Sequence, residues 1–187
     1  ALDDDLILIS DLDEIPNFES FNNFEIKDNI LIFEQKTFFY KLNLFYNDFV
    51  WFGTKGIKKK NLISPQWLRN IKATNYPKWR LDTYFSKKKY TNLSFIKNGG
   101  WHFTCLKTPE DLEKKLLSFA HHYEFELSGI KLADIKKMIN EKRVIYDHNV
   151  DQKSFKWSGK SKLQKIENNN LPSYVTNNLD KYKDWLI

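Results

Sequence analysis

A short apolar run, Leu6-Ile7-Leu8-Ile9, leads directly into an acidic loop, and this junction constrains the fold more than any other feature of the chain. An uninterrupted apolar run of this length is typical of a strand that is buried on both faces of a largely parallel sheet. The run is followed by Ser10-Asp11-Leu12-Asp13-Glu14-Ile15-Pro16, in which the proline prevents the strand from continuing. Open α/β sheets bind ligands at the carboxyl ends of their strands. The junction therefore predicts an α/β fold with carboxylates at a ligand-binding edge.

The remaining secondary structure follows from the spacing of apolar residues, turn residues and helix caps. Strands are expected over residues 30–33, 38–44, 50–52, 93–96 and 101–106, with a turn at Asn98-Gly99-Gly100. Helices are expected over residues 65–69, 109–123, 132–142 and 172–186, and weakly over 17–29 with Phe18, Phe21 and Phe24 on one side. Ser64 is the predicted N-cap of the first of these helices, and Thr108 is the predicted N-cap of the second. The helix over 109–123 has a predicted apolar stripe of Leu112, Leu116, Phe119, Ala120 and Tyr123. Residues 73–92 have no clear period and are interpreted as a long connection, and one domain is expected over residues 1–187.

The charge and cysteine content exclude some classes of protein. The net charge is +6, but only three of the 30 basic residues are arginine, which is the residue that specific nucleic-acid recognition favours, so no nucleic-acid partner is expected. No apolar run reaches the roughly 18 residues of a membrane span, and the sequence shows no secretory leader. Cys105 is the only cysteine, so no internal disulfide can form, and a reducing compartment such as the cytoplasm fits.

Asp11 and Asp13 are the strongest candidates for chemistry. Two carboxylates one residue apart in a turn can hold a divalent cation, Mn²⁺ or Mg²⁺, and through it a diphosphate. Asp-x-Asp is also common in turns, where the carboxylates merely cap backbone N–H groups. An aspartate-phosphatase motif is a further interpretation, but those enzymes usually carry threonine or valine two residues beyond the second aspartate, where this chain has Ile15-Pro16.

Four blocks in this order strengthen the first interpretation. They are Ser10-Asp11-Leu12-Asp13-Glu14-Ile15-Pro16, Trp51-Phe52-Gly53-Thr54, Gly99-Gly100-Trp101-His102-Phe103-Thr104 and Lys115-Leu116-Leu117-Ser118-Phe119-Ala120-His121. Together they resemble glycosyltransferase family 17, the β-1,4-mannosyl-glycoprotein N-acetylglucosaminyltransferase (bisecting GlcNAc transferase) family. Leu171-Pro172-Ser173-Tyr174 followed by an amphipathic helix is also similar to the carboxyl end of that family.

The resemblance implies a GT-A-like nucleotide-diphospho-sugar transferase fold, with a mixed sheet flanked by helices. It implies a UDP-sugar donor, usually UDP-N-acetylglucosamine, a divalent cation, a glycan or glycoprotein acceptor, and inversion at the anomeric carbon. Family members carry earlier strands before the acidic block. The chain is therefore expected to be the carboxyl-terminal portion of such a domain, which pairs with a missing amino-terminal segment or self-associates.

The resemblance also suggests roles for further residues. Glu14 or Glu110 is the candidate catalytic base, with Asp111 as an alternate for Glu110, although an acid in a first helical turn also compensates the helix dipole. His102 is a candidate metal ligand, and His121, with His122 behind it, a phosphate or metal contact. Lys115 is a candidate phosphate contact. Trp101, and less so Trp51, could stack on a sugar. Gly99 and Gly100 are predicted to bring backbone close to the sugar, with at least one at positive φ.

The sequence therefore predicts an inverting, metal-dependent transferase that moves a sugar, most simply N-acetylglucosamine, to a glycan acceptor. One alternative is a non-catalytic carbohydrate-binding domain or degenerate transferase, which would have lost its metal. A lysine-driven nucleic-acid binder is the other alternative, and its affinity would fall steeply with salt.

Overall fold

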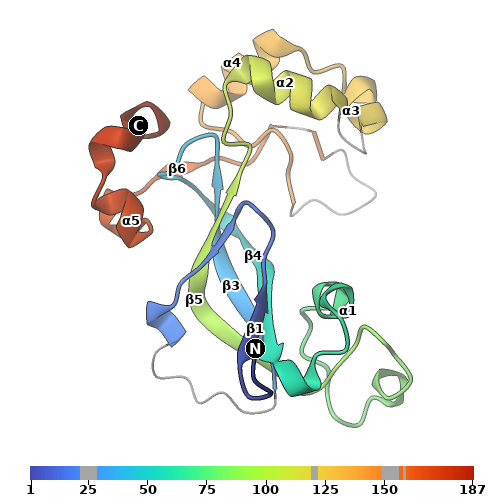
Figure 1. The fold of residues 1–187 in the computed structure, drawn as a ribbon. Helices are drawn as coiled ribbons and strands as arrows, with labels where there is room; N and C mark the ends of the chain where they lie inside the picture. The colour runs from blue at the N-terminus through green and yellow to red at the C-terminus, as the bar shows by residue number, and fades with distance from the viewer. Residues whose placement is uncertain (22–28, 119–121, 149–155, 158) are drawn as a thin grey trace. The chain divides into compact units, whose positions relative to one another are not determined.

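The computed structural model describes residues 1–21, 29–118, 122–148, 156–157 and 159–187. It shows an α/β chain built on a six-stranded sheet (Figure 1). The strands are β1 (Leu6–Ile9), β2 (Glu14–Pro16), β3 (Ile30–Phe39), β4 (Leu44–Lys58), β5 (Leu93–Thr104) and β6 (Gln164–Lys165). The α-helices are α1 (Pro65–Asn70), α2 (Pro109–Ser118), α3 (His122–Ser128), α4 (Leu132–Asn140) and α5 (Ser173–Thr176). Short 3-10 helices are η1 (Glu19–Phe21), η2 (Lys59–Asn61), η3 (Leu81–Thr83), η4 (Asn168–Asn170) and η5 (Leu179–Trp185).

The sheet is mixed, with strand order β1-β4-β3-β5-β2 and β6 paired to β4. β1 and β6 pair antiparallel with β4, and β2 pairs antiparallel with β5. β3 and β5 run parallel, because Ile30 N–H donates to Asn92 O at one end (3.0 Å) and Tyr40 N–H donates to Thr104 O at the other (3.3 Å). The mixed sheet of the expected fold class is thus present, and the GT-A assignment within that class stays a prediction.

The expectation that residues 6–9 form a strand buried in a largely parallel sheet is wrong. β1 is a half-buried, antiparallel strand at one end of the strand order. Its apolar run has a different cause, because both faces of the sheet carry apolar side chains. Leu6 and Leu8 pack on the cluster of Leu31, Phe33 and Ile96, and Ile9 packs on the cluster that contains Ile30 and Ile32.

The chain divides into two compact units whose boundaries cut through the three long strands. The first unit contains residues 1–35 and 51–102, and the second contains residues 36–50 and 103–187. In the first unit, alternate residues of β3 point to opposite faces. Ile30 and Ile32 pack with Ile57 and with Leu68 and Ile71 from α1 and its end, so α1 covers that face.

The core of the second unit lies between the strand segments of that unit and its helices. It contains Phe39, Tyr40, Leu44, Tyr46, Leu112, Leu116, Phe125, Ile135, Val144, Ile145, Trp157 and Leu163. Two buried hydroxyls are satisfied: Tyr40 Oη donates to Arg143 O (2.9 Å) and Tyr46 Oη donates to Asp147 Oδ1 (2.7 Å). Leu112 and Leu116 of the predicted stripe are buried, whereas Tyr123 is exposed. Phe119 and Ala120 lie outside the described residues.

Several predicted boundaries are wrong. The strand expected over 30–33 and the start of the one expected over 38–44 form one strand, β3, which ends at Phe39. A turn follows, in which Tyr40 has a φ of 63°, and Leu44 begins β4. The polar residues between them stay in the strand because buried Gln35 is hydrogen-bonded to Thr54 (3.0 Å). The strand expected over 50–52 is part of the long β4. Likewise, the strands expected over 93–96 and 101–106 are one strand, β5, with no chain reversal at Gly99-Gly100.

The predicted N-caps locate the starts of the helices more accurately than the apolar spacing locates their ends. Ser64 Oγ accepts from Trp67 N–H (3.1 Å) at the start of α1, and Thr108 Oγ1 accepts from Asp111 N–H (3.2 Å) at the start of α2, as predicted. α4 matches the helix expected over 132–142, and 73–92 is a long connection containing only η3. The helix expected over 109–123 is described as α2 and α3, and the final helix is divided into α5 and η5. Of the weak helix over 17–29, only η1 is described, and Phe24 lies outside the described residues.

Within the described ranges, no helix combines the length and apolar character that crossing a membrane requires.

Candidate functional site

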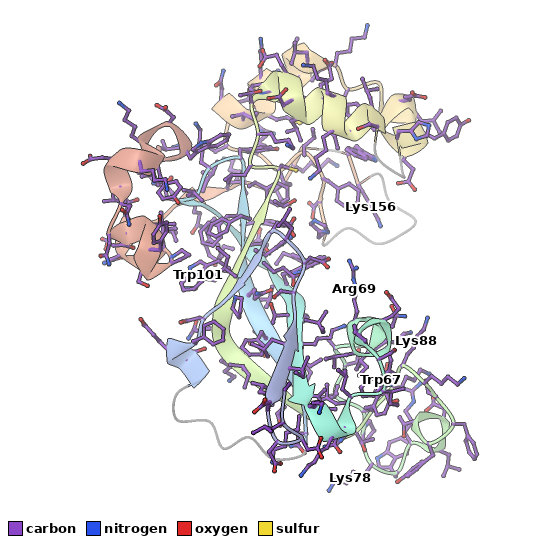
Figure 2. The ribbon with its side chains drawn as sticks, viewed as in Figure 1. Trp67, Arg69, Lys78, Lys88, Trp101 and Lys156 are labelled. Atoms are coloured by element: carbon purple, nitrogen blue, oxygen red, sulfur yellow. The ribbon has the colours of Figure 1, made fainter. Side chains whose placement is uncertain are left out.

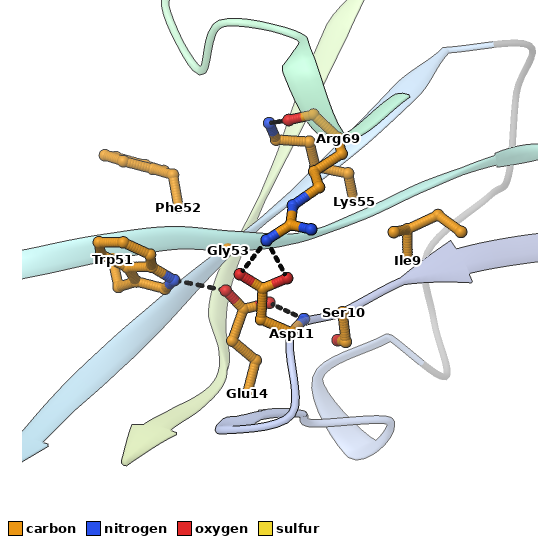
Figure 3. Close-up of a pocket in the computed structure, with 9 residues that line it drawn as sticks. All are labelled: Ile9, Ser10, Asp11, Glu14, Trp51, Phe52, Gly53, Lys55 and Arg69. Carbon is orange, nitrogen blue, oxygen red and sulfur yellow. Dashed lines mark hydrogen bonds and ion pairs between the residues drawn. The ribbon is translucent and has the colours of Figure 1, made fainter. Parts of the chain in front are cut away.

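A pocket opens in the first unit where β1 runs into the acidic loop (Figure 3). Its volume is about 170 Å³. It is lined by Ile9, Ser10, Asp11, Glu14, Trp51, Phe52, Gly53, Lys55 and Arg69. These residues come from the end of β1, the loop and start of β2, the middle of β4, and α1. Two carboxylates and two basic side chains thus face one small cavity beside a tryptophan.

Glu14 anchors the acidic loop from inside the pocket. Its residue is only 7% exposed. The Oε1 atom accepts from Trp51 Nε1 (2.6 Å) and the Oε2 atom accepts from the backbone N–H of Asp11 (2.9 Å). A buried carboxylate needs such donors, because leaving it without partners costs several kcal/mol. Both oxygens are therefore engaged in holding the loop and the indole in place.

Gly53 makes the Glu14–Trp51 contact possible. A Cβ atom at this position would collide with the Glu14 carboxylate and with Trp51 Nε1. The backbone of β4 therefore passes directly against the hydrogen bond between these two side chains. Only glycine leaves that space open, which explains glycine in the middle of a long strand.

Asp11 faces outward and is paired with α1. Arg69 Nη2 lies 2.8 Å from both Asp11 oxygens (Figure 3). The side chains of Arg69 and Asp11 are 57% and 41% exposed respectively, so water screens the pair. Arg69 reaches Asp11 because the cap at Ser64 fixes the start of α1 and places Arg69 in its last turn.

Asp13 turns toward β5 instead. The Nε2 atom of His102 lies 3.7 Å from Asp13 Oδ2. β2 and β5 pair with Glu14 opposite His102, which brings this histidine beneath the acidic loop. The His102 ring stacks on Trp51, with centroids 4.4 Å apart and planes 18° apart. The residue is 5% exposed, and its Nδ1 atom has no hydrogen-bond partner among the described residues.

The residues of the predicted metal site do not form an assembled cation site. Among the described residues, no three acidic, histidine or cysteine side chains cluster in the way that holds a metal ion. Asp11 and Asp13 nevertheless supply the oxygen ligands that Mg²⁺ and Mn²⁺ prefer, and such ions often use only one or two carboxylates together with substrate phosphates and water. The donor set therefore fits a cation that is shared with a phosphate, provided that Arg69 releases Asp11.

Lys55 is a second basic group of the pocket, and it is buried. Its residue is 8% exposed, and the Nζ atom donates to Arg69 O (2.5 Å) and Ile71 O (2.6 Å) at the end of α1. Burial lowers the pKa of Lys55, with Glu14 opposing the change. An ammonium has three N–H donors, so these two bonds leave one for the cavity that Lys55 lines.

The turn predicted at Gly99-Gly100 is wrong, but the predicted positive φ at one of the two glycines is confirmed. Gly99 and Gly100 lie within β5, and Gly100 has a φ of 143°. A Cβ atom on Gly100 would collide with Ile15 O, so the close approach is to β2. Trp101 pairs with Ile15 in the adjacent register position. Gly100 thus allows β2 to lie directly against β5, whereas Gly99 lies close to Phe33 and Glu34 of β3. Contact of either glycine with a sugar stays a prediction.

Two predicted site residues, Glu110 and Lys115, do not line this pocket. Glu110 and Lys115 belong to α2 in the second unit. Glu110 Oε1 lies 2.7 Å from Lys136 Nζ, and this hydrogen bond lowers the pKa of Glu110. Lys115 is half-buried and Asp111 exposed. His121 lies outside the described residues, and His122 begins α3.

The sequence analysis missed the basic side of the pocket. Arg69 could have been singled out, because it is one of three arginines and follows a capped helix start. Lys55 had no signal of its own beyond its place after Gly53-Thr54. Ser10, a pocket residue, forms a short hydrogen bond between its Oγ atom and Thr54 Oγ1, which joins the loop to β4.

No protein-family profile, curated protein or solved structure matches this chain.

Proposed function

We propose that this chain carries the donor-binding centre of an inverting, metal-dependent glycosyltransferase that moves a sugar, N-acetylglucosamine, from a UDP-sugar to a glycan acceptor. One observation carries the proposal. Three blocks that are far apart in the sequence meet in one unit: the acidic loop with Asp11, Asp13 and Glu14, the β4 segment with Trp51, and the β5 segment with His102. These are three of the four blocks on which the family resemblance rests.

The size and charge of the pocket suit the diphosphate part of the donor. A volume of about 170 Å³ is below the roughly 300–1,000 Å³ of sites that enclose a whole small molecule. Arg69 and Lys55 supply donors for phosphate oxygens from the α1 side. Arg69 presents a planar guanidinium, which binds phosphate through charge-assisted hydrogen bonds. The nucleoside would then be bound outside this cavity.

Asp11 and Asp13 would hold the divalent cation together with the diphosphate. A cation in this place acts as a Lewis acid and neutralises the charge that develops on the departing diphosphate. Glu14 holds the loop that carries both aspartates. Its Oε2 atom accepts a hydrogen bond from the backbone N–H of Asp11, and its own strand, β2, pairs with β5 so that Glu14 lies opposite His102. Such pre-organisation lowers the cost of assembling charged groups around a substrate.

In the proposed reaction, the acceptor oxygen bonds to the anomeric carbon as the bond to the diphosphate oxygen breaks. A carboxylate takes the hydroxyl proton. Glu14 and Glu110 are the candidates for this base. Glu14 lines the pocket but already accepts two hydrogen bonds, and the ion pair with Lys136 makes Glu110 a weaker base. Glu110→Gln separates them: if Glu110 is the base, this variant loses turnover at an unchanged donor KM. If Glu14 is the base, Glu110→Gln keeps its turnover, and Glu14→Gln loses turnover and also raises the donor KM, because the variant disturbs the loop that carries Asp11.

The test uses Asp13→Ala in the full-length protein. We expect Mn²⁺-stimulated sugar transfer and UDP release to fall at least about 100-fold. The thermal unfolding midpoint should stay within a few degrees of its original value, because Asp13 is not buried. Asp180→Ala removes an acid from the second unit and serves as the matched control. Undiminished transfer by Asp13→Ala would contradict the site assignment.

A second candidate is a non-catalytic carbohydrate-binding or degenerate transferase domain. Two observations favour it: Arg69 is paired with Asp11, and protein donors engage both oxygens of Glu14. In a site that no longer binds a charged ligand, the remaining charged groups are expected to pair with one another. Such a domain would bind glycan but release no UDP from a UDP-sugar, and manganese would leave its glycan affinity unchanged.

A further inference from the structure

The connection formed by residues 73–92 in the first unit presents an unusual surface. Four large apolar residues there are strongly exposed: Trp79 (80%), Leu81 (74%), Tyr84 (69%) and Phe85 (91%). They lie within seven consecutive positions around η3. Scattered exposed apolar residues need no explanation, but a local group of this size commonly marks a contact surface.

The connection has its own buried residues and internal contacts. Lack of a core in this segment therefore does not explain why the four apolar residues are exposed. Tyr76 and Thr83 are buried. Arg80 and Lys89 lie over the Tyr76 ring, at 5.2 Å and 5.9 Å from its centroid. The same two cations bind Asp82, with Arg80 Nε at 2.6 Å and Lys89 Nζ at 2.5 Å from its oxygens, and they lower its pKa. The inward-facing positions are thus filled, and the apolar group points outward.

The same segment concentrates positive charge. Residues 73–92 contain five basic residues and one acid, a net charge of +4 in a chain whose total is +6. Asp82 is engaged by Arg80 and Lys89. That leaves Lys78, Lys87 and Lys88, which have no ion pair with any residue in the described ranges. Lys78 precedes the apolar group along the chain, and Lys87 and Lys88 follow it; Figure 2 labels Lys78 and Lys88 at separate places on this part of the chain.

We infer that residues 78–88 dock on an anionic lipid surface. Tryptophan and tyrosine favour the headgroup level of a bilayer, leucine and phenylalanine favour the acyl boundary, and lysines favour anionic headgroups. A nucleic acid would use the lysines and stack on aromatic rings, but it gains little from Leu81. The unpaired cations are also all lysines, whereas specific nucleic-acid binding favours arginine. The docked segment would hold the protein at the bilayer surface.

The experiment measures co-sedimentation of the full-length protein with vesicles of phosphatidylcholine alone and of phosphatidylcholine with 30% phosphatidylserine, without any sugar donor. We expect binding to the anionic vesicles and at least tenfold weaker binding to the neutral ones. Lys78→Gln/Lys87→Gln/Lys88→Gln should weaken binding about 100-fold, since each lysine near an anionic surface contributes about fivefold. Trp79→Ala/Phe85→Ala should weaken it at least tenfold. Because all five residues are exposed, the thermal unfolding midpoint should not change.

Tyr123→Ala/Leu127→Ala is the matched control, because both residues are similarly exposed (66% and 68%) but lie on α3. Equal binding to neutral and anionic vesicles, or an equal loss in this control, would overturn the inference. So would a loss confined to the lysine variant with the aromatic variant unaffected, together with competition by a single-stranded oligonucleotide. That result would identify a polyanion site instead. Sugar transfer is not measured, so the outcome does not depend on the proposed activity.

Discussion

Arg69 Nη2 lies 2.8 Å from both carboxylate oxygens of Asp11, so the basic residue of α1 occupies the first carboxylate of the acidic motif. Both side chains are partly exposed, and pairs of this kind contribute only about 0–1 kcal/mol. A ligand with greater charge can therefore separate them. On the proposed function, a diphosphate would take the Arg69 guanidinium and free the Asp11 carboxylate.

Arg69→Gln is expected to have opposite effects on two ligands. Manganese binding to the protein without nucleotide should tighten by up to about fivefold, because the variant removes the cation that competes for Asp11. Pyrophosphate binding should weaken about tenfold or more, because a charge-assisted hydrogen bond is lost. Titration calorimetry with each ligand alone measures both affinities.

Arg80→Gln is the matched control for that experiment, because Arg80 has a similar exposed ion pair, with Asp82, away from the pocket. It removes the same charge and should change neither affinity by more than about twofold. If Arg69→Gln weakened manganese and pyrophosphate binding alike, Arg69 would be supporting the fold of the site and would not be competing for Asp11.

Gly53→Ala should disturb the site through packing alone. The added methyl group meets the Glu14 carboxylate and Trp51 Nε1, and overpacking of this kind typically costs 1–3 kcal/mol. We expect a lower free energy of unfolding and a shift in tryptophan fluorescence, because the indole loses its hydrogen bond to Glu14. Gly129→Ala is the comparison, since its Cβ atom meets nothing within 4 Å and only its φ of 71° opposes the change. An unchanged fluorescence spectrum for Gly53→Ala would contradict the described contact.

Tyr46 predicts a loss of stability at alkaline pH. Burial raises the pKa of Tyr46 to about 12, and the neighbouring Asp147 adds to the rise. An unfolded tyrosine ionises near pH 10, so as the pH rises from 10 to 12 the unfolded state loses the proton first and the free energy of unfolding falls. The contribution of this side chain to that fall is about 2–3 kcal/mol.

Tyr46→Phe removes the ionisable group and should make the pH dependence shallower over this window. The measurement is the free energy of unfolding in urea at pH 9, 10.5 and 11.5. The variant will be less stable at every pH, because the hydrogen bond to Asp147 is lost, so only the slopes are compared. Parallel curves for the two proteins would show that Tyr46 does not remain protonated in the folded state.

The sequence by itself determined the local features of this protein. Ser64 and Thr108 marked the starts of α1 and α2 correctly, because a cap is a hydrogen bond to backbone N–H groups only three residues away. The acidic motif after β1 and the positive φ at Gly100 were also predictable from residue type. Each of these depends on neighbours along the chain.

Only the tertiary structure decided the strand partners and the basic side of the site. The apolar run of β1 is compatible with a central parallel strand or with an antiparallel edge strand between two apolar layers, and pairing with β4 selects the second. Gly99-Gly100 resembles a turn until β2 is seen to lie against β5. Arg69 and Lys55 reach the pocket because α1 packs beside β4. The hydrogen bonds from Lys55 to the carbonyl oxygens of Arg69 and Ile71 that fix this packing span 14 and 16 positions of the chain. Periodicity cannot specify such contacts, because it records which face of an element is apolar and not which element covers that face.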